Sequence, residues 1–368
     1  MQQDLEKLFR ISQHFQIYGE LTSVSICKVG HINETWAATY DQGGIRVRYI
    51  HQCINSSVFK DPAATMSNVA RVTKHIRSKL EAEGASQITR RSLILIPTKT
   101  GKDYFVDGEN YWRTFIFIEG ARTFEAITST QQAYLVGQSF GRFQSMLADL
   151  PGERLHETIA GFHDTRARFQ ALMQAAEANR FERALGAKAE IDFALKRKKI
   201  VGIIVDALAK GKIPERVTHN DTKLNNIMFD VKTDEALCVV DLDTVMPGCA
   251  LYDFGDMIRT TTNPMPEDEQ NLSKVKMSMP AFKKLAAGYH SSAKGFLTPA
   301  EKSLMAFSGK LITLELGMRF LTDHLAGDTY FRIHRQNHNL DRARAQFKLV
   351  ESIEEQEEAM QKFVDSLQ

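Results

Sequence analysis

The pattern of apolar residues changes once along the chain, just after residue 118. Before that point, apolar residues occur in short runs separated by turns that contain glycine or aspartate, which is typical of β-strands. One amphipathic helix interrupts these runs, and it begins at Asp61-Pro62, where an aspartate N-cap precedes a proline in the first turn. After that point the periodicity is mostly that of long helices. We therefore expect an α+β fold with a small β-rich lobe over residues 1–118 and a larger, mostly helical lobe over residues 119–368.

The expected elements follow from these patterns. Strands are predicted over residues 21–29, 35–40, 45–52, 92–97, 103–106 and 111–118. In the second lobe, helices are predicted over residues 130–150, 165–210, 281–289 and most of 298–368. A short β island at 216–243 interrupts the helices. The unusual polar clusters of the chain lie on or beside this island, so we expect the functional site there.

Composition excludes several classes of function. The chain has 368 residues, of which 43% are hydrophobic and 25% charged, as in ordinary globular proteins. The formal net charge of +2 predicts binding neither to nucleic acid nor to an anionic membrane. The four cysteines form no C-x-x-C pair, which argues against a zinc site or a disulfide framework. No secretory signal or membrane-spanning run is visible, so we expect a cytoplasmic protein that is a monomer or a weak homodimer.

The loop within VTHNDTKLNNIMFD carries the strongest chemical signal. Asn226 follows Asp221 by five positions, and Lys223 lies between them. This H-x-D-x-x-x-x-N spacing is typical of kinase catalytic loops, in which the aspartate meets the acceptor hydroxyl and the asparagine reaches a metal ion. The lysine would neutralise the transferring phosphoryl group. We predict that Asp221 and Lys223 are catalytic and that Asn226 binds Mg²⁺, while His219 orients the loop or, alternatively, transfers a proton.

A kinase also needs an acidic metal ligand on the following hairpin. Asp241 ends the next apolar strand, at a hairpin's length from Asp221. The letters D-F-G, which mark a metal-binding aspartate in protein kinases, contain Asp253, but this residue lies farther on, where a helix is expected to start. We therefore predict that Asp241 binds Mg²⁺ and that Asp253 caps a helix or braces the catalytic loop. Asp243 would share a strand face with Asp241, so it is a second metal candidate or another loop brace.

The first lobe carries weaker signals. In KVGHINETW, Gly30 and Asn33 could form a turn that covers phosphates, and we assign both to the nucleotide, although a simple hairpin turn also explains the glycine. Kinases pair a lysine on the third strand with the α and β phosphates. The corresponding strand here offers only Arg46, Arg48 and His51. Which group takes the role of the lysine is open.

Together these segments resemble a known family. HNDTKLNN, DLDTVMPG, DFGDMIR, the GHIN turn, FHDTRARF, FSGKLITLELGMRFL and GDTYF are similar, in order and spacing, to the phosphotransferases that include aminoglycoside and choline kinases. Within that group they resemble the bacterial N-acetylhexosamine 1-kinases, because HNDTK replaces the H-G-D form of the wider superfamily. The resemblance covers nearly the whole chain and implies a bilobal, protein-kinase-like fold.

The resemblance also implies an activity, namely ATP-dependent phosphorylation of the anomeric hydroxyl of N-acetylglucosamine or N-acetylgalactosamine. ATP is then the co-substrate and Mg²⁺ the cofactor. Arg319 in GMRFL and Tyr330 in GDTYF would approach the sugar, as would His31 in the GHIN turn. Gln52 stands where the narrow group has a glutamine-containing strand, and we assign it, with Glu119, to the nucleotide.

Two alternative functions stay open. One is phosphorylation of another small alcohol, such as choline, an amino alcohol or an aminoglycoside. A quaternary ammonium substrate calls for an aromatic cage, and no dense aromatic cluster lies beside the catalytic loop in the sequence. The other is a nucleotide-binding pseudokinase that acts as a regulator, which the missing lysine suggests and the set of Asp221, Asn226 and Asp241 argues against. The preferred sugar epimer does not follow from the sequence.

Overall fold

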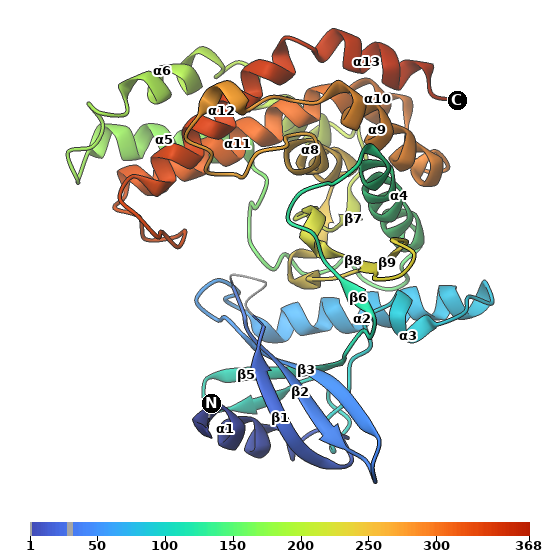
Figure 1. The fold of residues 1–368 in the computed structure, drawn as a ribbon. Coiled ribbons are helices and arrows are strands. Elements are labelled where there is room, and N and C mark those ends of the chain that lie inside the picture. Colours follow the sequence, from blue (N-terminus) through green and yellow to red (C-terminus); the bar gives the residue numbers. More distant parts are fainter. Residues whose placement is uncertain (1, 28–31) are drawn as a thin grey trace. The chain divides into compact units, whose positions relative to one another are not determined.

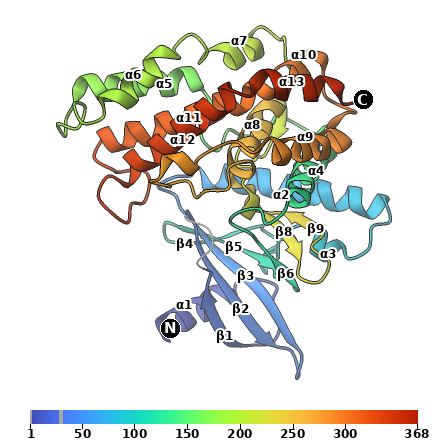
Figure 2. The same cartoon turned by 45° about the horizontal axis from the view of Figure 1, so that its top comes forward.

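The computed structural model describes residues 2–27 and 32–368, which form two compact units (Figures 1 and 2). Unit 1 contains Met1–Arg122, Asp149–Ala160 and Met228–Met246, and unit 2 contains Thr123–Ala148, Gly161–Ile227 and Pro247–Gln368. Gly30 and His31, which we assigned to the nucleotide and the sugar, lie outside the described residues. The boundary between residues 118 and 119 stays a prediction.

Unit 1 is built around a five-stranded antiparallel sheet with the order β1-β2-β3-β5-β4. Its strands are β1 (Glu20–Ile26), β2 (Glu34–Asp41), β3 (Arg46–Ile54), β4 (Phe105–Asp107) and β5 (Asn110–Ile116). The strand predicted over residues 92–97 is wrong, because this segment makes only an isolated bridge from Leu95 to Phe115. Pro97 ends the segment and has no N–H group with which to extend the pairing.

Helices and a second sheet complete unit 1. The helices are α1 (Gln2–Ser12), α2 (Pro62–Ala82) and α3 (Ile88–Arg91). As predicted, Asp61 caps α2, and its side chain accepts a hydrogen bond from the N–H of Ala64. The second sheet has the order β6-β8-β9, from β6 (Ala121–Arg122), β8 (Ile227–Asp230) and β9 (Ala236–Val239). The 3₁₀ turn η2 (Leu242–Thr244) follows and carries the acidic residues of the hairpin.

Unit 2 is mainly helical. It contains α4 (Thr130–Leu147), α5 (Thr165–Ala178), α6 (Lys188–Lys196), α7 (Ile203–Ala209), α8 (Ala250–Thr261), α9 (Met279–Ala293), α10 (Pro299–Ser303), α11 (Met305–Leu325), α12 (His338–Glu354) and α13 (Glu357–Ser366). Its shorter elements are β7 (Arg216–Thr218) and the 3₁₀ turns η1 (Leu224–Asn226) and η3 (Leu272–Lys274). The short strand β10 (Met246–Gly248) begins with the last residue of unit 1. The expected α+β class is confirmed.

Helix α11 is the central helix of unit 2. It packs against α5, α8 and α12, and most of its side chains are buried (Figures 1 and 2). The helix is apolar around most of its circumference, so it is held on most sides by other elements of the unit. Glu315 and Arg319 lie one turn apart on this helix, Glu315 fully buried and Arg319 half-buried.

Helices α4 and α9 pack closely through glycine. A Cβ atom placed on Gly288 of α9 would lie 2.0 Å from the carbonyl oxygen of Tyr134, and one on Gly137 of α4 would lie 2.1 Å from that of Leu285. Both distances are far below van der Waals contact, and the obstructing atoms belong to helix backbone. The two helices can approach this closely only because neither residue has a side chain.

We expect Gly288→Ala to destabilise the protein. The overpacking should cost roughly 1–3 kcal/mol, and the better helix propensity of alanine returns at most about 1 kcal/mol. A lower midpoint of urea or thermal unfolding would show this. Gly295→Ala is the matched control, because nothing lies within 4 Å of the added Cβ there. Equal midpoints for the two variants would contradict the close α4–α9 contact.

Candidate active site

The catalytic loop that follows β7 is held by the carboxylate of Asp253, which lies in α8 and is fully buried. Asp253 accepts hydrogen bonds from the backbone N–H of His219 at 2.9 Å and of Asn220 at 2.7 Å. The side chain of Gln144 donates a third, at 2.6 Å. The prediction that Asp253 braces the catalytic loop is therefore confirmed. Burial raises the pKa of Asp253, and the three donors oppose that effect.

A second carboxylate of α8 holds the next part of the loop. Asp256 accepts a hydrogen bond from the N–H of Thr222 at 2.8 Å. Its other oxygen accepts one from Arg259 Nε at 2.8 Å, and Arg259 also contacts Glu267 at 2.7 Å. Asp253 and Asp256 are three positions apart and share a helix face. One face of α8 thus accepts the backbone N–H groups of three of the four loop residues from 219 to 222.

The structure brings three of the predicted site residues together in unit 2. Lys223 Nζ lies 3.0 Å from Asp221 Oδ2, and Asn226 Nδ2 donates to the backbone oxygen of Asp221 at 2.8 Å and to Oδ2 at 3.2 Å. Burial acts to raise the pKa of Asp221, but Lys223 and His219 hold it below its ordinary value. Asp221 is therefore a carboxylate near neutral pH and can accept a proton.

The contacts of Asn226 also orient its amide. Both hydrogen bonds from Asn226 to Asp221 are donated by Nδ2, so Oδ1 is the atom turned away from Asp221. An amide oxygen beside a carboxylate offers the hard oxygen donors that Mg²⁺ prefers. The donor chemistry thus fits the metal role predicted for Asn226.

The acidic hairpin in unit 1 differs from the prediction in its geometry. Asp241 follows β9 in the left-handed conformation, with φ of 61°, and is exposed, whereas Asp243 lies in η2 with a side chain 1% exposed. The two residues therefore do not share the face of a strand, because the chain turns after Asp241. An exposed carboxylate can be reached by a metal ion from solvent, which fits the role predicted for Asp241.

Asp243 is engaged by protein groups. It forms a bidentate pair with Arg113 of β5, in which Nη1 donates to Oδ1 and Nη2 donates to Oδ2 at 2.9 Å. The side chain of Asn33 also donates to Oδ2, at 2.5 Å, and accepts from the N–H of Asn55 at 3.0 Å. Of the two roles that the sequence allowed for Asp243, its contacts support the loop brace.

Arg113 is a functional candidate that sequence reasoning missed. It pairs in register with Gln52 of β3, and its Nε donates to the Gln52 side-chain oxygen at 2.9 Å. The Gln52 amide nitrogen donates in turn to Thr35 at 3.0 Å. Arg113 is thus a buried cation beside β3, the strand on which kinases carry their lysine. An arginine on a strand gives no sequence signal that separates it from a surface arginine.

Two other polar residues of β3, Arg48 and His51, have partners of their own. Arg48 Nε donates to Glu119 at 2.8 Å, and this contact lowers the pKa of Glu119, which we assigned to the nucleotide. His51 lies between the hydroxyls of Tyr40 at 3.0 Å and Thr114 at 2.9 Å. Burial lowers the pKa of His51 to about 4, so this ring is neutral and supplies no charge for a phosphate.

A cavity of about 240 Å³ in unit 2 is lined by Arg319 and Tyr330, two of the three residues that were predicted to approach the sugar. We call it the Arg319 pocket. Its lining residues are Arg168, Ala171, Arg319, Thr322, Asp323, Ala326, Thr329, Tyr330 and Phe331. The structure therefore brings Arg319 and Tyr330 together, from α11 and from the segment after it.

Asp323 fixes the wall of the pocket that contains Tyr330. Its carboxylate accepts hydrogen bonds from the backbone N–H of Thr329, Tyr330 and Phe331 at 2.8–2.9 Å, and from the side chain of Asn339 at 2.9 Å. A carboxylate that accepts consecutive backbone N–H groups holds an irregular segment in one conformation. The wall is therefore ordered although the Tyr330 side chain is largely exposed.

The Arg319 pocket is cationic. The Arg319 guanidinium lies over the rings of Phe162 at 4.9 Å and Phe331 at 5.6 Å. Arg168, which sequence reasoning missed, donates to the backbone oxygens of Gly161 and Phe162. Burial and then Arg319 lower the pKa of Arg168. Within residues 2–27 and 32–368, no carboxylate forms an ion pair with either arginine.

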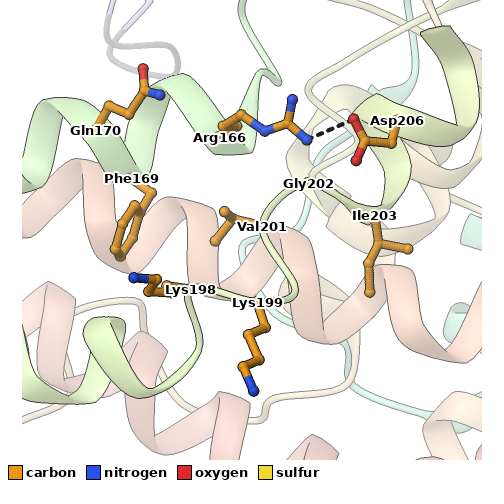
Figure 3. A pocket seen from close by; sticks show the side chains of 9 residues that line it. All are labelled: Arg166, Phe169, Gln170, Lys198, Lys199, Val201, Gly202, Ile203 and Asp206. Atoms are coloured by element: carbon orange, nitrogen blue, oxygen red, sulfur yellow. Dashed lines mark hydrogen bonds and ion pairs between the residues drawn. The ribbon is translucent and has the colours of Figure 1, made fainter.

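A second cavity in unit 2, of about 310 Å³, is shown in Figure 3. It is lined by Arg166, Phe169, Gln170, Lys198, Lys199, Val201, Gly202, Ile203 and Asp206, and Arg166 pairs with Asp206 at 2.6 Å. None of the predicted site residues lines it. Arg166 and Arg168 are two positions apart on α5 and belong to different cavities, so they form a natural pair for mutational comparison.

Two features are absent from the described part of the chain. It contains no helix that is both long and apolar enough to cross a membrane. It also contains no group of three or more His, Cys, Asp or Glu side chains suited to hold a metal ion. A magnesium ion that binds one or two protein oxygens and several phosphate oxygens needs no such group.

The fold and the catalytic loop together define a class. An antiparallel five-stranded unit, a helical unit and an H-x-D-x-x-x-x-N loop braced by buried carboxylates are the features of a protein-kinase-like phosphotransferase. Residues 23–273 match the Phosphotransferase enzyme family. The match covers more than half of the chain, and the protein belongs to this family. The expectation of a phosphotransferase is confirmed at this level.

Solved structures agree with the fold. A microcompartment-associated aminopropanol kinase is 14% identical with a TM-score of 0.56, and the match covers 97% of this chain and 98% of that one. An aminoglycoside phosphotransferase from Alicyclobacillus acidocaldarius is 10% identical with a TM-score of 0.61, over 98% and 96% of the two chains. A Plasmodium vivax ethanolamine kinase is 14% identical with a TM-score of 0.53, over 88% and 82%. At these identities the similarity shows the fold alone.

Replacing Asp253 and Asp241 in turn should separate the loop brace from the predicted metal ligand. Asp253→Ala leaves two backbone N–H groups and an amide buried without an acceptor, at a cost of about 1–3 kcal/mol for each group, so its unfolding temperature should fall steeply. Asp241→Ala removes an exposed carboxylate and should instead abolish the Mg²⁺ dependence of ATP binding with little change in unfolding temperature. Calorimetric titration of ATP with and without Mg²⁺ measures the second effect. The reverse pattern would assign the metal to Asp253.

Proposed function

We propose that this protein transfers the γ-phosphoryl group of ATP to the anomeric hydroxyl of an N-acetylhexosamine. The observation that carries the proposal is the Arg319 pocket, which combines two arginines with aromatic rings. The resemblance of the motifs around Asp221, Arg319 and Tyr330 to N-acetylhexosamine 1-kinases supports the same acceptor.

The charge of the pocket argues against an amine acceptor. Choline, amino alcohols and aminoglycosides are cations, and each would bring a positive charge toward Arg168 and Arg319. At an effective dielectric constant of 20, two like charges 4 Å apart repel by about 4 kcal/mol. The ring faces of Phe162 and Phe331 already lie against the Arg319 guanidinium, so those faces are not available to cage an ammonium group.

A neutral amino sugar suits the same groups. Guanidinium N–H groups donate hydrogen bonds and accept none, and an N-acetylhexosamine offers a carbonyl oxygen and several hydroxyl oxygens as acceptors. The Tyr330 ring lies 6.0 Å from the Arg319 guanidinium, and the hydroxyl of this largely exposed side chain can bond to the sugar. A site built from such donors rejects analogues that lack the matching oxygen, because its own groups are then left unpaired.

The chemistry assigned to the catalytic loop follows from its contacts. The anomeric oxygen attacks the γ-phosphorus, ADP leaves, and the hydroxyl proton passes to Asp221, late in a loose transition state. The anomeric hydroxyl is more acidic than other sugar hydroxyls, so a carboxylate of low pKa suffices as the base. Lys223, 3.0 Å from Asp221, neutralises charge on the transferring group.

Asn226 and Asp241 are proposed as the protein ligands of Mg²⁺, which supplies charge neutralisation to the phosphate oxygens. On the nucleotide side, Gln52 and Asn33 act through the Arg113–Asp243 pair that they contact. The roles of Gly30, His31 and Glu119 stay as predicted from the sequence.

A panel of acceptors with ATP and Mg²⁺ tests the function. We expect N-acetylglucosamine or N-acetylgalactosamine to give a sugar 1-phosphate, identified by NMR. The 1-O-methyl glycoside should be inert, because the attacking oxygen is blocked, and a 6-deoxy analogue should still react. Turnover of the methyl glycoside would refute transfer to the anomeric position. Turnover of choline, ethanolamine or aminopropanol in place of sugars would restore the amino alcohol alternative, and ATP binding without any turnover would favour the pseudokinase.

Arg319→Ala tests the acceptor site. Loss of a charge-assisted hydrogen bond costs about 1.5–3 kcal/mol, so kcat/KM for the sugar should fall roughly 10- to 100-fold, while KM for ATP stays within twofold. Arg166→Ala is the control, since it removes an arginine that lines the other cavity. A loss of sugar kcat/KM in Arg166→Ala equal to that in Arg319→Ala would remove Arg319 from the acceptor site.

A further inference from the structure

A buried histidine lies between the Arg319 pocket and the catalytic loop. His163 Nδ1 is 2.7 Å from Glu315 Oε1, and its Nε2 is 3.0 Å from the backbone oxygen of Asn220. The other carboxylate oxygen of Glu315 accepts a hydrogen bond from Thr165. His163 and Glu315 are almost completely buried, at 5% and 0% exposure. Neither the sequence motifs nor the assigned chemistry gives these residues a role.

The partners of His163 define its charge. A carboxylate and a backbone carbonyl both accept hydrogen bonds, so both ring nitrogens must donate, and the ring is an imidazolium. Burial acts to lower the pKa of His163, but Glu315 and the Asn220 carbonyl raise it above its ordinary value. Arg319 opposes this effect, and the ring of Tyr252 on α8 packs against the imidazole at 4.9 Å. A charged donor makes a stronger hydrogen bond than a neutral one.

The contact with Asn220 controls the peptide group next to the predicted base. Asn220 has a left-handed backbone, with φ of 65°, a conformation that a non-glycine residue keeps only when its surroundings impose it. Asp253 holds its N–H, and His163 holds its carbonyl oxygen. That carbonyl belongs to the peptide plane shared with Asp221, so its direction sets where the Asp221 backbone lies.

On the side of Glu315 and Phe162, His163 is connected to the Arg319 pocket. Glu315 lies one turn before Arg319 on α11. Phe162, the chain neighbour of His163, contacts the His163 ring at 4.7 Å and the Arg319 guanidinium at 4.9 Å. The path from Arg319 to the Asn220 carbonyl thus runs through the ring of the half-buried Phe162 and the buried His163.

We propose that His163 is a positioning residue, which fixes the Asn220–Asp221 peptide for catalysis and ties it to the helix that carries Arg319. The inference rests on Asp221 as the base and on no particular acceptor. His163 is buried and its ring nitrogens contact Glu315 and Asn220, so its effect is on the placement of Asp221.

Two near-isosteric variants test the role. Glutamine at position 163 can place an amide N–H near the position of Nε2 and so reach the Asn220 oxygen, whereas asparagine reaches only as far as Nδ1, on the Glu315 side. We expect His163→Gln to keep kcat within tenfold of the wild type and His163→Asn to lower it by about 100-fold, each with KM for ATP within twofold. The assay uses whichever acceptor the panel identifies. Equal kcat in the two variants would overturn the proposal.

A second measurement does not depend on any acceptor. Hydrogen exchange of the amides of residues 220–222 should be faster in His163→Asn than in His163→Gln, because only the former frees the Asn220–Asp221 peptide. His338→Ala is the control for a purely structural effect, since His338 is another buried histidine of unit 2 with a carboxylate partner, Asp268 at 2.9 Å. It should lower the unfolding temperature and leave both kcat and exchange at 220–222 unchanged. Unchanged exchange in His163→Asn would contradict the role even if the proposed sugar activity failed.

Discussion

The hydrogen bonds from two consecutive backbone N–H groups to Asp253 are the constraint on which the catalytic loop depends. The loop leaves β7 and passes through a left-handed residue, Asn220, so it cannot satisfy its N–H groups within a helix or a sheet. A buried N–H without an acceptor costs about as much as several ordinary hydrogen bonds contribute. Asp253 removes that cost at His219 and Asn220, and Asp256 does so at Thr222. The conformation of the loop is thus encoded in one face of α8.

The hairpin of unit 1 also contains a buried carboxylate that is held by hydrogen bonds. Asp241 is exposed and strained into the left-handed region, and the neighbouring Asp243 is buried and paired with Arg113. Burying an ion pair carries a desolvation cost that a hydrophobic pair would not have, so a buried pair is poor evidence for stability alone. Its bidentate geometry does fix orientation. In unit 2, the proposed base Asp221 lies in a loop held by the buried carboxylate of Asp253. In unit 1, the proposed metal ligand Asp241 lies two positions before the buried carboxylate of Asp243.

The sequence predicted the site residues that stand at a fixed spacing in one loop. It did not predict the residues whose role depends on partners elsewhere in the structure. Asp221, Lys223 and Asn226 stand in a fixed interval, and the structure places them within hydrogen-bond or ion-pair distance. The D-F-G string lies farther along the sequence from Asp221 than a hairpin's length. For that reason the sequence predicted that Asp253 is not the metal ligand. Arg113 and Arg168 were missed because their partners are residues far away in the chain or carbonyl groups, which leave no periodicity. The strand predicted over residues 92–97 has the right apolar pattern, but hydrogen-bond pairing, not pattern, decides whether a strand forms.

Helix α11 contributes to the charge of the Arg319 pocket from within the core. Glu315 is its buried carboxylate, and His163, Arg319 and Arg168 all interact with it electrostatically. Burial acts to raise the pKa of Glu315, but His163, Thr165 and Arg319 hold it below its ordinary value, so it is ionised. The negative charge of Glu315 then interacts with three positive charges, which belong to His163, Arg319 and Arg168. Because the hydrogen bonds of Glu315 go to His163 and Thr165, they do not occupy the Arg319 guanidinium, whereas Arg168 already donates to the backbone oxygens of Gly161 and Phe162. A pocket that takes a cation would need a further carboxylate at this position, and the described lining offers only Asp323, whose oxygens already hold the Thr329–Phe331 backbone.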